Sequence, residues 1–342
     1  MQIELPISKS IANRWLILQA IHGDELMPVS DSMPDDVRIM SEAIRLLGER
    51  REARIDLGNC GTAMRFLTAY CAQLEGQITI LDGVERMRHR PIGQLVDALR
   101  EIGADIEYLG EEGFPPLRIK GCVLDKHRIV TIHNPQSTQF VSALLLIGAN
   151  VQTNSTSPYI TLTRTLIQHY TTLHQSTQHY TIERDWSSAA FWYEYVALHG
   201  GEIELPGLYK DSLQGDKVVV DIFAYLGVHT KYNDEGIVIY SSPLHSTPYT
   251  LHQDFAFCPD LYPAVALTCE RLGVTLHATG VESLPLKESD RLRAVREHRT
   301  EHDHRMAMAL LIAGYEVDDT ACINKSYPQF FEQWKTIVRS HA

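Results

Sequence analysis

The sequence predicts an α+β protein with two pseudo-symmetric domains, each made of three repeats of one helix-and-strand unit. Three observations support this fold class: helical stretches that are apolar on most faces, amphipathic helical stretches that alternate with them, and short β-like runs between the two. A chain of 342 residues, 44% of them hydrophobic, can bury the cores of two such domains. The alternative is a single irregular α/β fold in which the repetition only reflects ordinary alanine-rich helices.

The apolar helices are expected in the core, because a helix that is apolar nearly all round is usually buried. Clear examples cover residues 63–71, 140–147 and 189–198. A polar residue, often beside Ser, Thr or Gly, opens each stretch of this kind. Such openings recur along the chain at Lys9-Ser10, Gly61-Thr62, Ser137-Thr138, Asp185 with Ser187-Ser188, Pro259-Asp260 and Asp303-His304.

The amphipathic helices form the second set. They are expected at residues 35–47, 91–102, 160–170, 216–226, 287–298 and 328–338. Gly48, Gly103 and Gly227 end three of them, as glycine often does at a helix C-terminus. Pro91 and Pro328 stand where a first helical turn tolerates proline.

Short β-like runs fill the gaps, for example at 77–81, 117–119, 128–132, 236–240 and 274–278. Six pairs of helices with strands between them divide most naturally near Glu183, where the third unit ends. We therefore expect an N-terminal three-unit domain over 9–183 and a C-terminal three-unit domain over 184–342. Residues 1–8 are expected to pair into the second domain, and the active site to lie in the cleft between the domains.

Charge and cysteine content exclude several classes of protein. The formal net charge of −12 argues against nucleic-acid binding and against a protein that coats anionic membranes. Residues 1–6 lack the parts of a signal peptide, and no apolar run reaches the roughly 18 residues of a membrane span. No C-x-x-C pair occurs among the 6 cysteines, which predicts reduced thiols and a cytoplasmic protein.

The 16 histidines raise the question of a metal site, above all at His298, His302 and His304. Their spacing matches no known metal signature, so we expect no metal.

Helix N-termini bind anions, so buried helices that start beside one cleft would form an anion site there. Seven cations could join them: Lys9, Arg14, Arg90, Lys287, Arg291, Arg305 and Lys325. Such a cluster would repel itself unless an anionic ligand neutralised it, which predicts phosphate and carboxylate substrates. The alternative for each residue taken singly is a solvated surface position.

Several motifs, in order along almost the whole chain, resemble those of the 5-enolpyruvylshikimate-3-phosphate (EPSP) synthase family. They lie at residues 9–14, 59–65, 86–93, 137–140, 287–291, 303–308 and 325–328. The resemblance implies the enolpyruvyl transferase fold, an inside-out α/β barrel with three βαβαββ-like units and buried helices in each domain. It also implies a monomer without metal or organic cofactor that transfers the enolpyruvyl group of phosphoenolpyruvate to the 5-hydroxyl of shikimate 3-phosphate.

The resemblance assigns residues to each substrate. Those matching shikimate 3-phosphate positions are Ser10, Arg14, Ser137, Thr138, Gln139, Thr156, Tyr159, Asp260 and Lys287. Those matching phosphoenolpyruvate positions are Lys9, Gly61, Arg90, Gln139, Arg291, Arg305 and Lys325. For proton transfer we expect Asp260 to act on the hydroxyl and Glu288 with Lys9 at the enolpyruvyl end, with His304 nearby.

This chain departs from the family pattern in composition and in length. Cys60 and Phe66 replace alanine and proline, and Ser283 replaces a common asparagine. Connections near 50–54, 152–156, 173–178 and 298–303 are short. A helix over 287–298 travels roughly 16 Å, and five residues return at most about 17 Å, which leaves no room for two strands. Either this is a deletion or the sequence lacks residues there, and we favour the second.

Two other functions remain open. A UDP-N-acetylglucosamine enolpyruvyl transferase shares the fold, although residues 85–89 contain no counterpart of its reactive cysteine. A catalytically inactive family member is the second. Gly61, which has no side chain to crowd the pocket, predicts inhibition by glyphosate.

Overall fold

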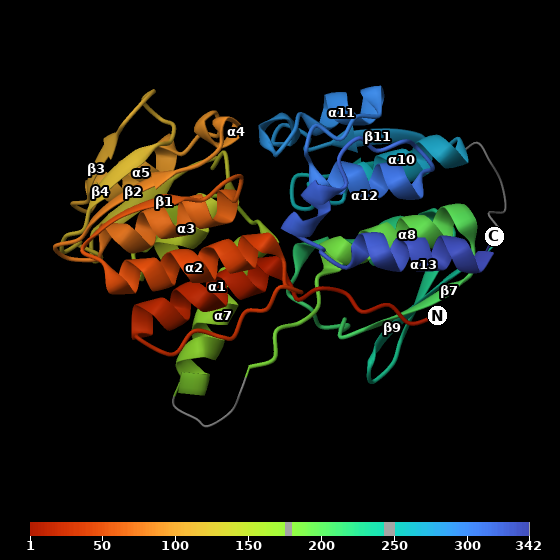
Figure 1. Ribbon diagram of the computed structural model, residues 1–342, viewed down its shortest axis with the longest axis horizontal. Coiled ribbons are helices and arrows are strands. Elements are labelled where there is room, and N and C mark those ends of the chain that lie inside the picture. Colours follow the sequence, from red (N-terminus) through yellow and green to blue (C-terminus); the bar gives the residue numbers. More distant parts are fainter. Residues whose placement is uncertain (175–179, 243–249, 342) are drawn as a thin grey trace. The chain divides into compact units, whose positions relative to one another are not determined.

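The computed structural model describes residues 1–174, 180–242 and 250–341, and the chain forms two compact units (Figure 1). Unit 1 contains Met1–Lys9, Asp31–Asp35 and Ile182–Ala342, and unit 2 contains Ser10–Ser30 and Asp36–Thr181. The last segment of unit 1 begins at Ile182, two residues before the predicted start of the C-terminal domain at residue 184. Lys9, which we had assigned to the N-terminal domain, groups with unit 1.

Unit 1 is built on three buried helices. Its helices are α8 (Trp186–His199), η1 (Gly215–Val218), α9 (Val219–Tyr225), α10 (Tyr262–Leu272), η2 (Leu284–Leu286), α11 (Arg291–Glu297), α12 (His304–Ile312), η3 (Ala321–Lys325) and α13 (Phe330–His341). As predicted, α8 and α12 are apolar on most faces, and nearly all of their side chains are buried. Helix α10 packs against both.

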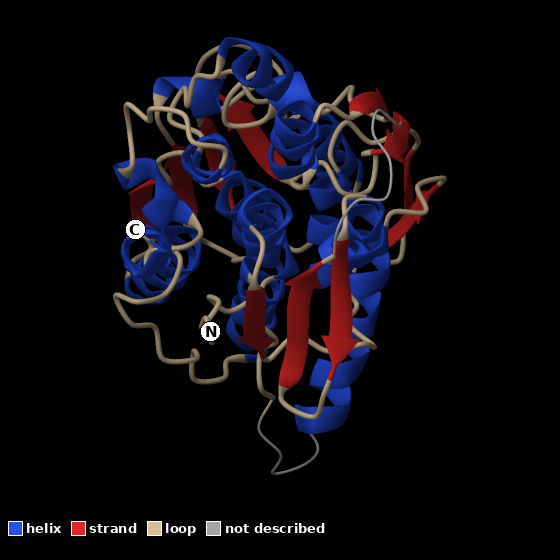
Figure 2. Ribbon diagram, turned by 90° about the vertical axis from the view of Figure 1, so that its right-hand side faces the viewer, coloured by secondary structure: helices blue, strands red, loops and turns tan. Residues whose placement is uncertain are grey.

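The strands of unit 1 form two sheets. They are β7 (Glu202–Pro206), β8 (Val228–Tyr232), β9 (Gly236–Ser241), β10 (Thr250–Asp254) and β11 (Thr275–Thr279). An antiparallel sheet has the order β7-β9-β8 and packs against α8 and α9, and β10 pairs with β11 in parallel (Figure 2). The start of the chain adds a parallel bridge between Gln2 and Glu204.

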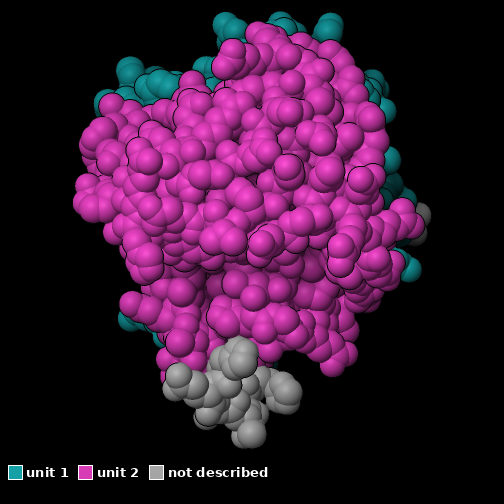
Figure 3. Space-filling view, turned by 90° about the vertical axis from the view of Figure 1, so that its left-hand side faces the viewer, with its two compact units in different colours: residues 1–9, 31–35, 182–342 teal, residues 10–30, 36–181 magenta. Residues whose placement is uncertain are grey.

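Unit 2 is also made of helices and short strands. Figure 3 shows its surface in magenta. Its helices are α1 (Lys9–His22), α2 (Asp35–Glu49), α3 (Gly61–Ala72), α4 (Glu85–Arg88), α5 (Gly93–Glu101), α6 (Thr138–Leu146) and α7 (Pro158–His174). Its strands are β1 (Glu52–Asp56), β2 (Ile78–Asp82), β3 (Asp105–Tyr108), β4 (Leu117–Lys120), β5 (Ile129–Ile132) and β6 (Asn150–Thr153). They form a sheet of order β1-β2-β4-β3 and a parallel pair β5-β6.

The βαβαββ unit is complete in the segment from β1 to β4. Strands β1 and β2 are parallel and flank α3, whereas β3 and β4 follow α5 and pair antiparallel. Every residue of α3 is buried, and the helix packs against β2, β4, α5 and α6. Elsewhere among the described residues the helix pairs recur with fewer strands, because connections such as that from α11 to α12 are only a few residues long.

The predicted helix over 287–298 is shorter than expected. Helix α11 starts only at Arg291, because Asp290 caps it by accepting a hydrogen bond from Arg293 N (3.2 Å). Residue Lys287 before the cap is extended. His298, Glu301 and His302 have positive φ values and turn the chain back to α12 within six residues.

Candidate active site

The buried helices of unit 1 begin beside one another, and a carboxylate lies at or just before the start of each. Asp303 caps α12 by accepting a hydrogen bond from Arg305 N (2.9 Å). Asp260, just before α10, forms an ion pair with Arg305 Nη2 (2.8 Å). Asp185 caps α8 and also accepts a hydrogen bond from Lys9 N (3.2 Å). The predicted convergence of helix N-termini therefore holds within unit 1.

Asp260 lies at the centre of the cations of unit 1. Its carboxylate pairs with Lys287 Nζ (3.5 Å), Arg291 Nη1 (2.8 Å) and Arg305 Nη2 (2.8 Å). Burial alone would raise the pKa of Asp260, but Arg305, Lys287, Arg291 and Lys9 together hold it well below its ordinary value. With its side chain 23% exposed, Asp260 is an ionised carboxylate that a ligand can reach.

Arg291 is fully engaged by the chain itself. Its side chain is 1% exposed, and its guanidinium contacts Asp303 Oδ2 (2.8 Å), Asp260 Oδ1 (2.8 Å) and Glu288 Oε2 (3.2 Å). Burial tends to lower the pKa of Arg291, but the three carboxylates raise it overall. Glu288 also pairs with Lys325 Nζ (3.0 Å). The expectation that only a ligand could neutralise the cations is therefore wrong for unit 1, where carboxylates do so.

His304 and Arg305 are buried, and each has polar side-chain atoms that make no hydrogen bond to the described residues. His304 is 1% exposed, and neither ring nitrogen has a hydrogen-bond partner among the described residues. Burial, followed by the charges of Lys9 and Arg305, lowers the pKa of His304 well below its ordinary value, so the imidazole is neutral. Arg305 is 2% exposed, and its Nε and Nη1 likewise lack a partner within the described parts of the chain. Unsatisfied buried donors of this kind are costly, which points to an anionic ligand.

Asp216 interacts electrostatically with Asp260 and Arg305, and sequence reasoning missed it. It is buried in η1 and accepts a hydrogen bond from Ser187 Oγ at the start of α8. Burial and the negative charge of Asp260 raise the pKa of Asp216 to about 6, against the opposing effect of Arg305. The only signal for Asp216 in the sequence is indirect: its hydrogen-bond donor, Ser187, belongs to the polar opening at Asp185 and Ser187.

In unit 2, Arg14 is held from several sides. Its Nε donates to Thr163 Oγ1 (2.7 Å), its Nη2 to Ser142 Oγ (3.1 Å), and its Nη1 to the carbonyl of Ser10 (2.8 Å). Burial lowers the pKa of Arg14 to about 10. The guanidinium lies over the ring of Phe66, 5.2 Å from its centroid. The departure from proline at Phe66 therefore adds a cation–π contact to a predicted substrate residue.

Gly61 is the first residue of α3 and lies close to the side chains of Arg65 and Arg90. A Cβ atom on Gly61 would lie 2.7 Å from Arg90 Nη1 and 2.5 Å from Arg65 Nη1. A side chain here would push against both guanidinium groups, so glycine lets Arg90 lie close to the start of this helix. Cys60, the neighbouring departure, caps the helix, since its Sγ accepts a hydrogen bond from Ala63 N (3.4 Å).

The other predicted residues of unit 2 lie at or near the starts of α6 and α7. Ser137 caps α6 by accepting a hydrogen bond from Gln139 N (3.3 Å), and Thr138 is the first residue of that helix. The side chain of Gln139 reaches Thr62 Oγ1 (2.9 Å) at the start of α3. Thr156 is exposed just before α7, and Tyr159 lies in its first turn.

The structure thus separates the predicted residues into two sets. Unit 1 brings together Lys9, Asp260, Lys287, Glu288, Arg291, His304, Arg305 and Lys325. Unit 2 carries Ser10, Arg14, Gly61, Arg90, Ser137, Thr138, Gln139, Thr156 and Tyr159.

The three histidines considered for a metal do not converge. His298 stacks on Tyr315 and bonds Glu270, whereas His302 bonds Asp319. Among residues 1–174, 180–242 and 250–341, no group of three or more potential metal ligands lies together.

Comparisons with known proteins agree with these features. The sequence profile of the family described as EPSP synthase (3-phosphoshikimate 1-carboxyvinyltransferase) matches residues 1–298 and, separately, 296–334. The two matches meet at the short connection between α11 and α12.

A 3-phosphoshikimate 1-carboxyvinyltransferase of Bacteroides fragilis is 37% identical over 390 residues, covering 96% of this chain and 93% of its own. That of Colwellia psychrerythraea is 29% identical over 412 residues, covering 97% and 95%. The solved EPSP synthase from Acinetobacter baumannii superposes with a TM-score of 0.67 at 19% identity, covering 98% of this chain and 95% of that one, which confirms the predicted α+β fold. The chain belongs to the EPSP synthase family.

Proposed function

We propose that the protein transfers the enolpyruvyl group of phosphoenolpyruvate to the 5-hydroxyl of shikimate 3-phosphate and releases phosphate. The observation that carries this proposal is Arg305, a buried guanidinium with two unpartnered donors beside Asp260 and the neutral His304. A phosphate or carboxylate oxygen would satisfy these donors through charge-assisted hydrogen bonds. Family membership supplies the identity of the substrates.

Phosphoenolpyruvate is proposed to bind the cations of both sets. The residues are Lys9, Gly61, Arg90, Gln139, Arg291, Arg305 and Lys325. Because Glu288 and Asp260 already pair with Lys325, Arg291 and Arg305, ligand oxygens would replace these carboxylates on some of the cations. Released from their pairs, the carboxylates can then take part in proton transfer.

Shikimate 3-phosphate is proposed to bind the second group of residues. These are Ser10, Arg14, Ser137, Thr138, Gln139, Thr156, Tyr159, Asp260 and Lys287. The start of α6 offers backbone N–H groups and hydroxyls to its phosphate. Lys287 and Asp260, which pair at 3.5 Å, would form hydrogen bonds with the ring hydroxyls.

The reaction adds the hydroxyl oxygen to C2 of phosphoenolpyruvate while C3 gains a proton, and then expels phosphate as C3 loses a proton. Asp260 is ionised and accepts the hydroxyl proton in this scheme. Glu288, with Lys9, exchanges the proton at C3. His304 is neutral and can donate one hydrogen bond and accept another.

The decisive experiment measures phosphate release from phosphoenolpyruvate with shikimate 3-phosphate and, separately, with UDP-N-acetylglucosamine. Turnover with the first acceptor alone is expected; turnover with neither would show an inactive member. Asp260→Asn and Glu288→Gln should each reduce kcat at least a hundredfold, the loss typical of an acid or base. Glu297→Gln, on the exposed side of α11, is the control. Near-normal turnover of both variants would remove these residues from the mechanism.

We further propose that the enzyme acts as a monomer in the cytoplasm without metal. All 6 cysteines are free thiols, as expected in a reducing compartment. No helix within the described ranges has the length and apolar character of a membrane span. Sedimentation at increasing protein concentration tests the monomer, and activity after extensive chelation tests the independence from metal.

A further inference from the structure

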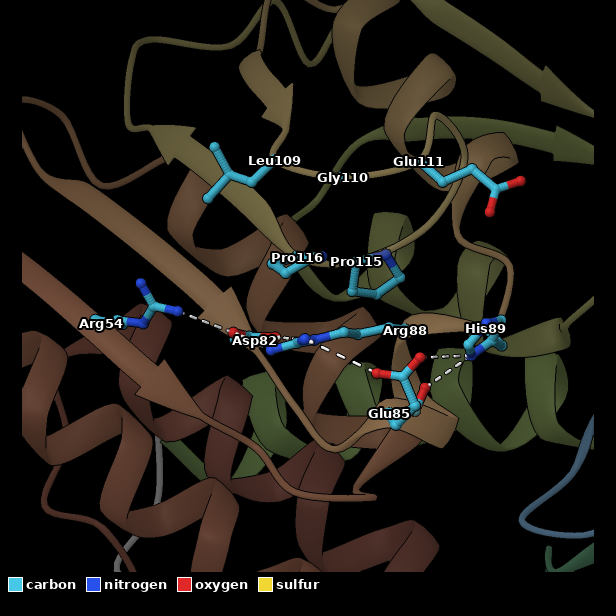
Figure 4. Close-up of a pocket in the computed structure, with 10 residues that line it drawn as sticks. All are labelled: Arg54, Asp82, Glu85, Arg88, His89, Leu109, Gly110, Glu111, Pro115 and Pro116. Atoms are coloured by element: carbon cyan, nitrogen blue, oxygen red, sulfur yellow. Dashed lines mark hydrogen bonds and ion pairs between the residues drawn. The ribbon is translucent and has the colours of Figure 1, made fainter.

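Unit 2 contains a pocket outside the predicted site, with a volume of about 470 Å³. Arg54, Asp82 and Arg88 lie along one wall, and Leu109 and Pro116 lie opposite (Figure 4). The wall that contains Asp82 marks the end of β2 and the start of the segment that leads through α4 to Arg90.

Asp82 is the hub of this wall. Its carboxylate accepts two hydrogen bonds from Arg88, through Nε and Nη2 (both 3.0 Å), and one from Arg54 Nη2 (3.1 Å). A fourth comes from Gly83 N (2.8 Å). Partial burial would raise the pKa of Asp82, but the hydrogen bonds from Arg88, Gly83 and Arg54 lower it overall. The carboxylate is therefore ionised at neutral pH, and the paired bonds to Arg88 close the chain from 82 to 88 into a loop.

This loop leads directly to a predicted substrate residue. Met87 is fully buried and fixes the loop to the core, and its carbonyl accepts a hydrogen bond from Arg90 N (3.0 Å). Beyond it, Arg65 Nη2 donates to the carbonyl of Pro91 (3.3 Å). The backbone of Arg90 is thus held on both sides, with its guanidinium at Gly61.

The loop is also tied to the strand-to-helix turn that carries Gly61. Val84 N donates to the carbonyl of Gly58 (3.1 Å), and a Cβ atom on Gly83 would lie 2.5 Å from the same oxygen. The loop is therefore held against this turn near Asp82, whereas the Asp82–Arg88 bonds fix its far end, next to Arg90.

We propose that Asp82 and Arg88 form a clamp that positions Arg90 for phosphoenolpyruvate. Neither residue needs to touch the substrate; both are positioning residues. The inference rests on the proposed function, and it adds two residues that the resemblance did not assign to the site.

The test compares Asp82→Asn, Arg88→Gln and the double variant by steady-state kinetics and thermal unfolding. Each single variant should raise the KM for phosphoenolpyruvate about tenfold, since small misplacements of binding groups have effects of this order. The KM for shikimate 3-phosphate should change less than about twofold. The double variant should be no worse than either single variant, because all three remove the same interaction.

Glu107→Gln is the matched control. It breaks another carboxylate–arginine pair on the same sheet, between Glu107 and Arg118 (3.2 Å), on strands β3 and β4 away from the loop. It should leave both KM values unchanged. Arg88→Gln keeps the bonds of Asp82 to Arg54 and Gly83, so it provides a folded variant if Asp82→Asn does not fold.

Unchanged KM values in Arg88→Gln, or equal rises for both substrates, would overturn the clamp. Additive effects in the double variant would do the same, since the residues would then act independently. An inactive wild-type protein would instead contradict the proposed function, so the two failures are distinguishable.

Discussion

Gly61→Ala tests the contact between α3 and Arg90 with a single methyl group. The added Cβ would lie 2.7 Å from Nη1 and 2.8 Å from Cζ of Arg90. A normal contact is about 3.5 Å, so the guanidinium must retreat by roughly 0.7 Å. Arg90 is buried, and the backbone on either side of it is hydrogen-bonded. The shift therefore changes the direction of the hydrogen bonds that we propose it makes to phosphoenolpyruvate.

A displacement near 1 Å can cost about a hundredfold in rate, so we expect the KM for phosphoenolpyruvate to rise between tenfold and a hundredfold. Folding should hardly change, because alanine favours the helix and Gly61 has no strained φ. The assay is phosphate release at saturating shikimate 3-phosphate, with thermal unfolding in parallel. Glyphosate should inhibit the wild type at millimolar concentration and the variant more weakly.

Gly48→Ala is the control, since a Cβ there would meet nothing within 4 Å. A Gly61→Ala enzyme with the wild-type KM would refute the reasoning, because Arg90 would then tolerate the methyl group or not bind the substrate. An unchanged wild-type rate in millimolar glyphosate would refute the predicted sensitivity.

Phe66→Leu removes the aromatic ring that lies against the Arg14 guanidinium. The lost cation–π contact is worth about 1 kcal/mol, so the KM for shikimate 3-phosphate should rise about fivefold. An equal rise in the KM for phosphoenolpyruvate would argue against this role. Arg291→Met leaves the buried Asp303 without its paired cation and should lower the free energy of unfolding by about 3–5 kcal/mol in urea titration. A loss below about 1 kcal/mol would contradict this. Burial raises the pKa of Glu194, so the stability that this group contributes should be lost as pH rises above about 4.3. The difference in stability between the wild type and Glu194→Gln should therefore change with pH, and parallel pH profiles would disprove it.

The buried helices could be predicted from the sequence because their signals are local. Ser137, Asp185 and Asp303 each precede an apolar run, and each caps a helix in the structure. A cap depends on hydrogen bonds to residues two or three positions away, so the sequence alone reveals it.

The start of α11 could not be predicted in this way. Helical periodicity continues back to Lys287, but the residues before Asp290 make distant contacts instead. Lys287 pairs with Asp260, and Glu288 pairs with Lys325. These partners are 27 and 37 positions away in sequence, and such tertiary contacts override local helix propensity.

The site cations came from the family motifs, whereas two of the carboxylates around them, Asp303 and Asp216, were not assigned to the site. Asp303 was assigned to neither substrate, yet it pairs with Arg291 at 2.8 Å, as closely as Asp260 does. Asp216 lies in η1, at the start of a stretch that the sequence marks only as an amphipathic helix. Both roles depend on how separate helices pack, which no spacing along the chain encodes.

The internal pairing of Asp260 and Glu288 with the cations of unit 1 has a consequence for selectivity. A tethered carboxylate competes with every free anion at a high effective concentration. Chloride or a single carboxylate would interact with these cations hardly more strongly than Asp260 and Glu288 already do. A ligand carrying several negative oxygens at once can replace more than one tethered group in a single step. The protein's own acids would thus act as a filter that excludes the abundant small anions of the cell and admits only polyanions.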